Sequence, residues 1–179
     1  MKAATGQQAG MNQQKFEALF SKYREVVYKT AYSLTGRKQE ALDIQQTIFL
    51  RLIDNGETLE SAPNPKAYLC RAAMNEARQR FRTRTRHQHT DDDVERFADP
   101  SSDRSRGQTD MQERLLEALT RMEPEHSEML ILWSVHGYTD QEIADALGKK
   151  RSTVAVALHR AKDRLKELLC AGSKEGETQ

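Results

Sequence analysis

The sequence predicts an all-α protein made of two small helical bundles joined by a flexible linker, with a helix-turn-helix in the second bundle. Hydrophobic residues are 37% of the chain and charged residues 31%, a balance that favours small bundles with solvated outer faces over one large core. Apolar residues recur at intervals of three and four, and no stretch alternates long enough to indicate a sheet. Glycine and proline number only 9 and 4 in 179 residues.

The chain divides into five parts by composition. Residues 1–13 are rich in Gln, Gly and Ala and are predicted to be disordered. Residues 14–85 form the first helical domain, residues 86–108 an acidic flexible linker and residues 109–170 the second helical domain. Residues 171–179 are predicted to be a disordered tail. We expect the linker to contain the boundary between the two domains.

Three helices are predicted in the first domain. The first carries an apolar stripe from Phe16 to Leu34 and ends at Gly36, and the second covers residues 38–53 with a broad apolar band. A loop over residues 54–63 leads to the third helix, which continues to about residue 85. Asn64 supplies its N-cap oxygen and Pro65 suits its first position.

The second domain has stronger local signals. After a helix over residues 110–122, Pro124 begins another helix, whose apolar block at residues 129–133 should be largely buried. Thr139 and Glu142 have the spacing of a capping box at the start of a short helix, which ends at Gly148. A final helix over residues 152–170 completes a helix-turn-helix pattern.

The final helix has two faces of different character. Val154, Leu158, Ala161, Leu165 and Leu168 form one apolar stripe, so the opposite face must meet solvent or DNA. The cations at the helix start and the helix N-terminal amides could bind phosphates, while small apolar side chains could touch thymine methyl groups. A helical hairpin with a solvated basic face is the alternative interpretation. The opposite face and adjoining turn hold Lys149, Lys150, Arg151, Ser152, Ala155, Val156, His159 and Arg160.

Charge is concentrated although the net charge is only +1. Seven basic residues and a single acid, Glu76, lie between Lys66 and Arg86, and an acidic stretch follows in the linker. A helix places Arg71, Asn75, Arg78 and Arg82 on one narrow stripe that could follow a DNA backbone. A solvated basic face explains the same spacing.

The second predicted helix carries a mixed surface. Asp43, Gln46, Thr47 and Leu50 share one face that is too apolar at Leu50 for solvation alone. This combination indicates a surface for another macromolecule.

Several classes of function find no support in the sequence. There is no Ser/His/Asp order, Gly-rich phosphate loop or metal-binding spacing, so we expect no catalytic residues, no metal and no cofactor. Cys70 and Cys170 are a hundred residues apart and are expected to be reduced thiols. No apolar run reaches eighteen residues and the N-terminus lacks a signal core, which predicts a cytoplasmic protein without membrane insertion.

Five segments together resemble the extracytoplasmic-function (ECF) sigma factors, the promoter-specificity subunits of bacterial RNA polymerase. Residues 40–52 (E-A-L-D-I-Q-Q-T-I-F-L-R-L) are similar to the family segment D-A-E-D-I-V-Q-E-T-F-L-R-L. Residues 64–75 (N-P-K-A-Y-L-C-R-A-A-M-N) are similar to N-P-x-x-[WY]-L-x-x-I-A-x-N. Residues 122–126, 138–148 and 153–162 resemble the promoter-distal module, and the shared order covers most of residues 15–169.

The resemblance implies a role for each surface in a protein that initiates transcription and is not an enzyme. Core RNA polymerase would bind the face that includes Asp43, Gln46, Thr47 and Leu50. The loop over residues 54–63 would capture a flipped base of the promoter's minus-ten element, so that capture of single-stranded DNA drives strand separation. The final helix would enter the major groove of the minus-thirty-five element, and an anti-sigma factor is a further partner of such proteins. The implied minus-ten contacts are Lys66, Arg71, Asn75, Arg78 and Arg82; the implied minus-thirty-five contacts are Lys149, Lys150, Arg151, Ser152, Thr153, Ala155, Val156, His159 and Arg160.

The chain departs from the family pattern at two places, and two alternatives stay open. Leu42 and Gln45 stand where the family has an acid and an aliphatic residue, which alters part of the polymerase-facing surface. Residues 155–157 (A-V-A) replace the common Lys-Ser-Arg, which removes two cations and predicts weaker or differently selective promoter binding.

A helix-turn-helix repressor would explain only the last sixty residues, and a degenerate sigma-like protein would bind partners without initiating transcription.

Overall fold

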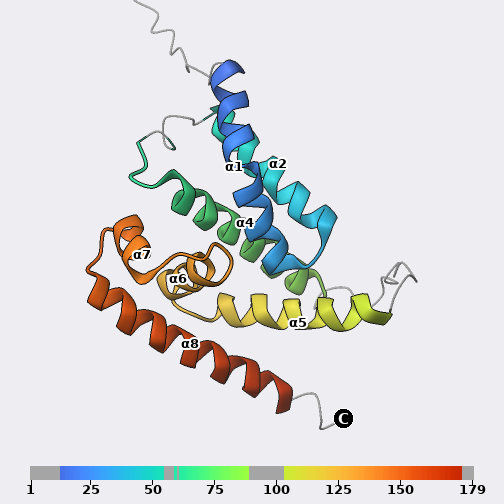
Figure 1. Ribbon diagram of the computed structural model, residues 1–179. Coiled ribbons are helices and arrows are strands. Elements are labelled where there is room, and N and C mark those ends of the chain that lie inside the picture. Colours follow the sequence, from blue (N-terminus) through green and yellow to red (C-terminus); the bar gives the residue numbers. More distant parts are fainter. Residues whose placement is uncertain (1–12, 55–58, 60, 89–102, 175–179) are drawn as a thin grey trace, which may run out of the picture.

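A computed structural model describes residues 13–54, 59, 61–88 and 103–174, and these residues form helices joined by short turns, with no strand among them (Figure 1). The first bundle consists of α1 (Gln13–Thr35), α2 (Lys38–Asp54) and α4 (Pro65–Gln88). The second consists of α5 (Asp103–Thr120), α6 (Pro124–Ser134), α7 (Asp140–Leu147) and α8 (Arg151–Lys174). The all-α prediction is therefore confirmed.

Local sequence signals set the helix ends in the first bundle. α1 ends at Thr35, and Gly36 follows in the left-handed conformation with φ of 67°. Asn64 caps α4, because its Oδ1 accepts a hydrogen bond from the backbone N–H of Ala67 at 3.0 Å. Pro65 occupies the first helical position, where its missing N–H costs nothing.

Two helices extend into the segment that the sequence assigned to the linker. α4 continues to Gln88 and α5 already begins at Asp103, whereas the expected linker covered residues 86–108. No proline lies between Pro65 and Pro100 or between Pro100 and Pro124. Once a helix has formed, each further residue adds one hydrogen bond at little cost in free energy, so the helix continues until a residue such as proline interrupts it. The rest of the expected linker lies outside the described residues. Of the two ends expected to be disordered, residue 13 belongs to α1 and residues 171–174 belong to α8, and the other residues lie outside the described part of the chain.

Each bundle has apolar side chains at the positions that the periodicity predicts. In the first bundle Val27 and Leu34 of α1 and Ile44 of α2 are fully buried, and the Phe20 and Phe49 rings meet edge to face at 4.8 Å between centroids. In the second bundle the predicted stripe of α8 faces inward, with Val154 fully buried. Burying each large apolar side chain contributes about 1.5–3 kcal/mol, so these stripes dominate the stability of both bundles.

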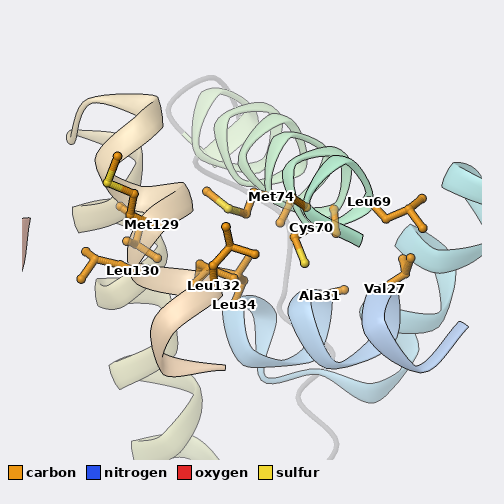
Figure 2. Close-up of a cluster of buried hydrophobic side chains, with 14 of the residues drawn as sticks. Val27, Ala31, Leu34, Leu69, Cys70, Met74, Met129, Leu130 and Leu132 are labelled. Atoms are coloured by element: carbon orange, nitrogen blue, oxygen red, sulfur yellow. The ribbon is translucent and has the colours of Figure 1, made fainter. Parts of the chain in front are cut away.

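The two bundles also pack against each other. Figure 2 shows Met129, Leu130 and Leu132 of α6 beside the side chains of Leu34 and Met74 from the first bundle. All these side chains are at most 4% exposed, so the buried residues form one continuous cluster across both bundles. The bundles are thus distinct in sequence but share an apolar interface, which the sequence did not indicate.

One residue of the apolar block departs from its prediction. Met129, Leu130, Ile131 and Leu132 are buried, but Trp133 is 43% exposed and the ammonium of Lys162 lies 3.4 Å from its ring centroid. A cation over the indole face compensates part of the exposure by a cation–π interaction. Within the described parts of the chain, no helix has the length and apolar character needed to cross a membrane.

Candidate nucleic-acid interface

The helix-turn-helix has the local geometry that its sequence predicts. The Thr139 hydroxyl accepts from the backbone N–H of Glu142 at 3.3 Å, and the Glu142 carboxylate accepts from the backbone N–H of Thr139 at 2.8 Å. This reciprocal pair is a complete capping box and begins α7. Gly148 ends α7 with φ of 66°, and the backbone N–H of Lys149 then donates to the carbonyl of Ala144 at 2.8 Å. These contacts fix the direction in which α8 leaves the turn.

The face of α8 opposite the apolar stripe is open to solvent. Lys150, Arg151, Ser152, Thr153, Val156, His159 and Arg160 are exposed, and Val156 is 51% exposed although it is aliphatic. Lys149 is less free, because its ammonium pairs with Glu125 at 2.8 Å, and Ala155 is half-buried. The structure therefore brings the predicted minus-thirty-five residues together at the N-terminal end of one helix.

The predicted polymerase-facing residues lie along α2. Gln46 is exposed, and Leu50 is 54% exposed, so the described residues leave about half of this apolar residue in contact with solvent. Asp43 is half-buried and accepts a hydrogen bond from Gln39 at 3.0 Å. Thr47 is used internally, because its hydroxyl donates to the Asp43 carbonyl at 2.8 Å and accepts from Arg80 at 3.0 Å. Three of the four predicted residues thus present side chains outward.

The predicted minus-ten residues of α4 fall into two groups. Asn75 and Arg82 are exposed as the stripe predicted. Lys66 and Arg71 are instead directed at the second bundle: the Lys66 ammonium lies 4.7 Å from the centroid of the Tyr138 ring, and Arg71 donates from Nε to Glu128 at 2.8 Å. A DNA strand would have to compete with these contacts.

Arg78 departs most from the prediction of a DNA-facing stripe. Its side chain is directed into the interface, and the residue is only 8% exposed. One of its terminal nitrogens donates to the Leu119 carbonyl at 2.7 Å and to the Ser127 hydroxyl, both in the second bundle. Periodicity places Arg78 on the same side of α4 as the other residues of the stripe. At this position, however, α5 and α6 pack over that side of the helix and bury the Arg78 side chain. In this arrangement Arg78 is not available to a phosphate.

Two grooves adjoin the exposed part of α4. A polar groove of about 550 Å³ lies along its C-terminal half and is closed at one side by Pro124. It is lined by Asn75, Arg78, Gln79, Arg82, Thr83, Arg86 and Pro124. A second groove of about 430 Å³ lies between α2 and α4 and is lined by Ile48, Arg51, Leu52, Tyr68, Arg71, Ala72 and Asn75. Cations beside an aromatic ring are the groups that hold single-stranded nucleic acid.

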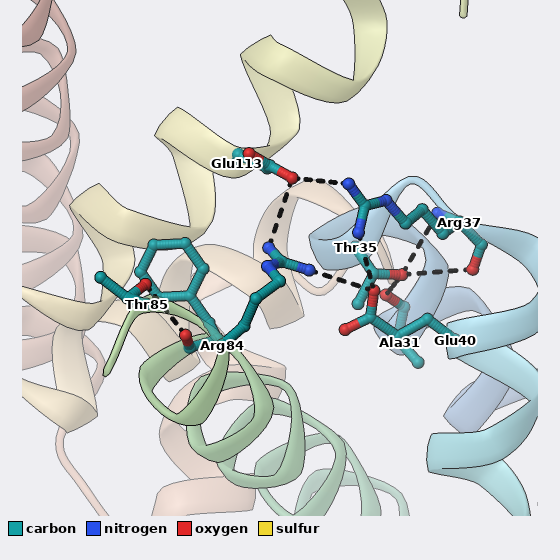
Figure 3. A network of polar contacts seen from close by, with 8 residues as sticks. Ala31, Thr35, Arg37, Glu40, Arg84, Thr85 and Glu113 are labelled. Carbon is teal, nitrogen blue, oxygen red and sulfur yellow. Dashed lines mark hydrogen bonds and ion pairs between the residues drawn. The ribbon is translucent and has the colours of Figure 1, made fainter. Parts of the chain in front are cut away.

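A polar network holds the bundles together beside α5 (Figure 3). Glu113 accepts from Arg37 at 2.7 Å and pairs with Arg84 at 3.4 Å, and Arg84 also pairs with Glu40 at 3.6 Å. Three of the seven cations of the basic segment are therefore engaged with carboxylates, because Arg80 pairs with Glu76 at 3.0 Å and Arg71 with Glu128 at 2.8 Å in addition to the pairs of Arg84. The basic segment of the sequence is only partly a free basic surface.

Buried titratable groups at the interface have shifted pKa values. Burial raises the pKa of Glu128, an effect that the hydrogen bond from Arg71 opposes, and within the described structure its second oxygen has no hydrogen-bond partner. Burial, with the charges of Lys66 and Lys29, lowers the pKa of His136 to about 4, so this ring is neutral near pH 7. His136 Nε2 lies 2.7 Å from the Thr30 hydroxyl, a further polar contact between bundles.

Sequence reasoning missed the residues that hold the second bundle against α1 and α4. Glu128 is a carboxylate next to a five-residue apolar block, and a charge in such a place signals a buried pair because unpaired charges are rarely buried. Ser127, Glu113 and His136 gave no comparable signal. Their partners are far away along the chain: Arg78 lies 49 residues from Ser127 and Thr30 lies 106 residues from His136. Glu113 meets Arg37 across 76 residues and Arg84 across a shorter separation.

Comparisons with known proteins agree with this architecture. The Sigma-70 region 2 family matches residues 19–87, and the Sigma-70 region 4 family matches residues 112–165. The ECF RNA polymerase sigma factor SigE of Mycolicibacterium smegmatis is 28% identical over 176 residues, which cover 96% of this chain and 67% of SigE. RNA polymerase sigma factor CarQ of Myxococcus xanthus is 27% identical, with 88% of this chain and 90% of CarQ covered.

A solved structure supports the same assignment. The sigma factor RpoE from Bartonella quintana, crystallised in complex with the anti-sigma factor NepR, matches with a TM-score of 0.52 and 25% identity, over 87% of this chain and 97% of RpoE. The two matched regions lie in the order and positions of the two bundles, with the helix-turn-helix inside the second. A repressor would leave the first matched region unexplained, so this chain belongs to the ECF family and is an RNA polymerase sigma factor.

Proposed function

We propose that this sigma factor has three binding surfaces. In this proposal α2 binds core polymerase, α4 binds the separated minus-ten strand, and the N-terminal end of α8 binds the minus-thirty-five duplex and recognises its sequence. The observation that carries the proposal is the exposed set of residues at the start of α8, because a cationic helix end beside an aliphatic Val156 fits phosphates and a thymine methyl group. Residues 155–157 (A-V-A) supply no cation to this helix. Base contacts therefore contribute a larger share of the binding than they would beside additional phosphate contacts.

The α2 surface suits a large protein partner. Leu50 is an exposed aliphatic side chain between helix faces that are otherwise polar, and Gln46 and Asp43 lie one and two turns before it. An apolar centre with a polar rim is the usual composition of a protein–protein contact. We assign Asp43, Gln46 and Leu50 to direct contact and Thr47 to support of the helix through Arg80.

The α4 surface suits a single strand. Asn75 lines both grooves, Arg82 lines the polar groove and Tyr68 lines the groove between α2 and α4. An aromatic ring can stack with an unpaired base while the arginines hold the adjoining phosphates. Residues 55–58 and 60 of the loop expected to capture a flipped base lie outside the described residues. Strand separation would use binding free energy alone, so we expect no chemical step, metal or cofactor.

An anti-sigma factor is a further partner that we propose, together with a cytoplasmic location. Support comes from RpoE of Bartonella quintana, whose structure holds the anti-sigma factor NepR. An apolar groove of about 450 Å³ between α5, α6 and α8 offers a surface for it, lined by Leu119, Ile131 and Leu165 among others and bordered by Lys162 and Lys166. Such a groove fits an amphipathic helix with acidic residues at its edge.

Run-off transcription with core polymerase and a promoter library tests the proposal. We expect transcripts that depend on this chain, and permanganate reactivity of minus-ten thymines in the same complexes. Asn75→Ala with Arg82→Ala should reduce permanganate reactivity at least about tenfold while duplex binding at the minus-thirty-five element stays unchanged. Arg164→Ala is the matched control, because this arginine is exposed and, among the described residues, pairs locally with Glu167.

Two results would count against the assignment. Duplex binding without any transcript would favour the repressor or the degenerate sigma-like protein. Equal strand opening by the α4 variant and the control would remove α4 from the minus-ten contact.

A further inference from the structure

We propose that the apolar groove between α5, α6 and α8 binds a single-chain amphiphilic anion, of the chemical class of a medium-chain fatty acid. The alkyl chain lies along the apolar wall of the groove, and the anionic head group lies beside Lys162 and Lys166 at its border. The site is separate from the proposed polymerase and DNA surfaces and does not depend on them. It uses the groove that we propose for an anti-sigma factor, so the amphiphile and that partner exclude each other.

The groove arises because the apolar stripe of α8 is only partly covered in its second half. Val154 and Ala161 of this stripe are fully buried, whereas Leu165 is half-buried and lines the groove. α8 contacts both α5 and α6 (Figure 1), and Leu115 of α5 is a second half-buried side chain of the lining. The volume of about 450 Å³ is within the range of roughly 300–1,000 Å³ that is usual for small-molecule sites. A ligand that removes these side chains from water gains free energy from their burial.

The charges at the groove favour an anion. Lys166 is exposed, and Lys162 lies one helical turn before it, so both ammonium groups project from the same side of α8. A neighbouring acid of this helix, Glu167, pairs with Arg164 at 3.0 Å instead. Among the described residues neither lysine forms an ion pair, and the lining contains no Asp or Glu. A negatively charged head group therefore fits this border better than a neutral or a cationic one.

The exposure of Trp133 indicates that the groove lacks an apolar occupant. The four residues before it in the apolar block are buried, but Trp133 itself is 43% exposed and lines the groove. The ammonium of Lys162 lies 3.4 Å from the centroid of its ring. An alkyl chain would cover the indole while its anionic end accepts hydrogen bonds from the same ammonium, which has three N–H donors. One amphiphilic molecule thus satisfies the apolar and the charged part of the site together.

Trp133 also provides the measurement, because it is the single tryptophan of the chain. We would titrate the full-length protein with decanoate, below the concentration at which decanoate forms micelles, and record the tryptophan emission. Equilibrium dialysis with radiolabelled decanoate gives the affinity and the stoichiometry independently of fluorescence. Hexanoate tests the alkyl chain, and decanol and decylamine test the charge of the head group.

We expect one decanoate per chain and a blue shift of the Trp133 emission that saturates. Hexanoate should bind at least about tenfold more weakly than decanoate, because each buried methylene raises the affinity up to about fourfold. Decanol and decylamine should bind at least about fivefold more weakly than decanoate, since neither can pair with an ammonium group. Added salt should weaken the binding of decanoate but not that of decanol.

Two variants test the two parts of the site separately. Lys166→Glu reverses the charge at the head group, and Ser134→Phe fills part of the groove from an exposed position at the end of α6. Lys166→Glu should weaken decanoate binding at least about fivefold and change decanol binding less than about twofold. Ser134→Phe should weaken the binding of both ligands at least about fivefold, because it occupies volume that the chain needs. Arg164→Glu and Ser21→Phe are the matched controls, since both residues are exposed and neither lines the groove.

Circular dichroism verifies that all four variants keep the helical content of the wild type. The inference is overturned if decanoate does not bind saturably, if many molecules bind per chain, or if Lys166→Glu and Arg164→Glu have equal effects. Binding of an anti-sigma factor that Ser134→Phe abolishes, without any binding of decanoate, would assign the groove to the protein partner alone. A dimer in sedimentation velocity that Ser134→Phe dissociates, again without decanoate binding, would assign it to a second copy of the chain.

Discussion

Arg71 of α4 donates its Nε–H to the Glu128 carboxylate of α6 at 2.8 Å, and this ion pair joins the two bundles of the sigma factor. The two partners have unequal surroundings, because the Arg71 side chain is 56% exposed and that of Glu128 only 5%. The carboxylate thus depends on the arginine far more than the arginine depends on the carboxylate.

This asymmetry predicts unequal effects of the two single substitutions on stability. Arg71→Gln leaves a buried charge without its cation and should lower the free energy of unfolding by about 1–3 kcal/mol. Glu128→Gln removes the buried carboxylate and leaves its partner Arg71 exposed to solvent, so its cost should stay below about 1 kcal/mol. Urea unfolding of both single variants and the double variant measures this, and additive effects would show that the pair is not coupled.

Leu50 should be important for polymerase binding and unimportant for folding. Because the side chain is 54% exposed, Leu50→Ser should change the stability by less than about 0.5 kcal/mol but weaken core-polymerase binding about tenfold. Met111→Ser is a matched control, since Met111 of α5 is also 54% exposed. Fluorescence anisotropy with labelled sigma factor gives both affinities, and equal losses in the two variants would exclude a specific role for Leu50.

The two kinds of contact on α8 should respond differently to substitution. Arg151→Ala removes a phosphate contact, so it should weaken all promoters alike and lower the magnitude of the log–log salt slope by about 0.9. Val156→Lys replaces an aliphatic contact by a cation and should lower the ratio of matched to mismatched minus-thirty-five binding about tenfold. Duplex-binding titrations over a range of salt concentrations measure both. If neither substitution has an effect, α8 does not read the promoter.

Gly148 should tolerate asparagine better than other substitutions. Its φ of 66° strains residues with a Cβ, while the space around an added Cβ is empty, so the cost comes from the backbone alone. We expect Gly148→Ala to destabilise the protein by about 1 kcal/mol, Gly148→Asn by less and Gly148→Val by more. Thermal unfolding of the three variants establishes the order, and a smaller cost for Val than for Asn would contradict the backbone explanation.

His136 should make the protein sensitive to acid. Its pKa is lowered to about 4 in the folded protein, so the unfolded chain binds a proton first as the pH falls. Stability is therefore fully present above the unfolded pKa of about 6.5 and is lost progressively towards pH 4, by about 1–3 kcal/mol. The raised pKa of Glu128 has the opposite effect, because the folded state then binds a proton more readily than the unfolded state.

Comparison with His136→Gln separates these two contributions. Urea unfolding at pH 7.5 and at pH 4.5 should show a smaller loss of stability in the variant than in the wild type. An equal loss in both proteins would assign the acid sensitivity to other groups.

The sequence by itself determined the helices, their ends and the two outward faces. Asn64, the Thr139–Glu142 capping box and Gly148 could be predicted because each acts within four residues of itself, and the Val154 stripe because a helix repeats every 3.6 residues. The exposed residues of α2 and α8 followed from the same periodicity. The family resemblance then gave these faces their implied partners.

Only the tertiary structure decided which faces the other bundle covers. Arg78 and Arg82 both belong to the predicted stripe of α4, yet Arg78 is buried against Leu119 and Ser127 while Arg82 is exposed. Periodicity gives the direction of a side chain about its own helix axis. It contains no information about the second bundle, whose residue Leu119 contacts Arg78 although it lies 41 residues further along the chain. The apolar interface around Leu132 and its buried polar pairs set that docking, and these contacts exist only once both bundles are folded.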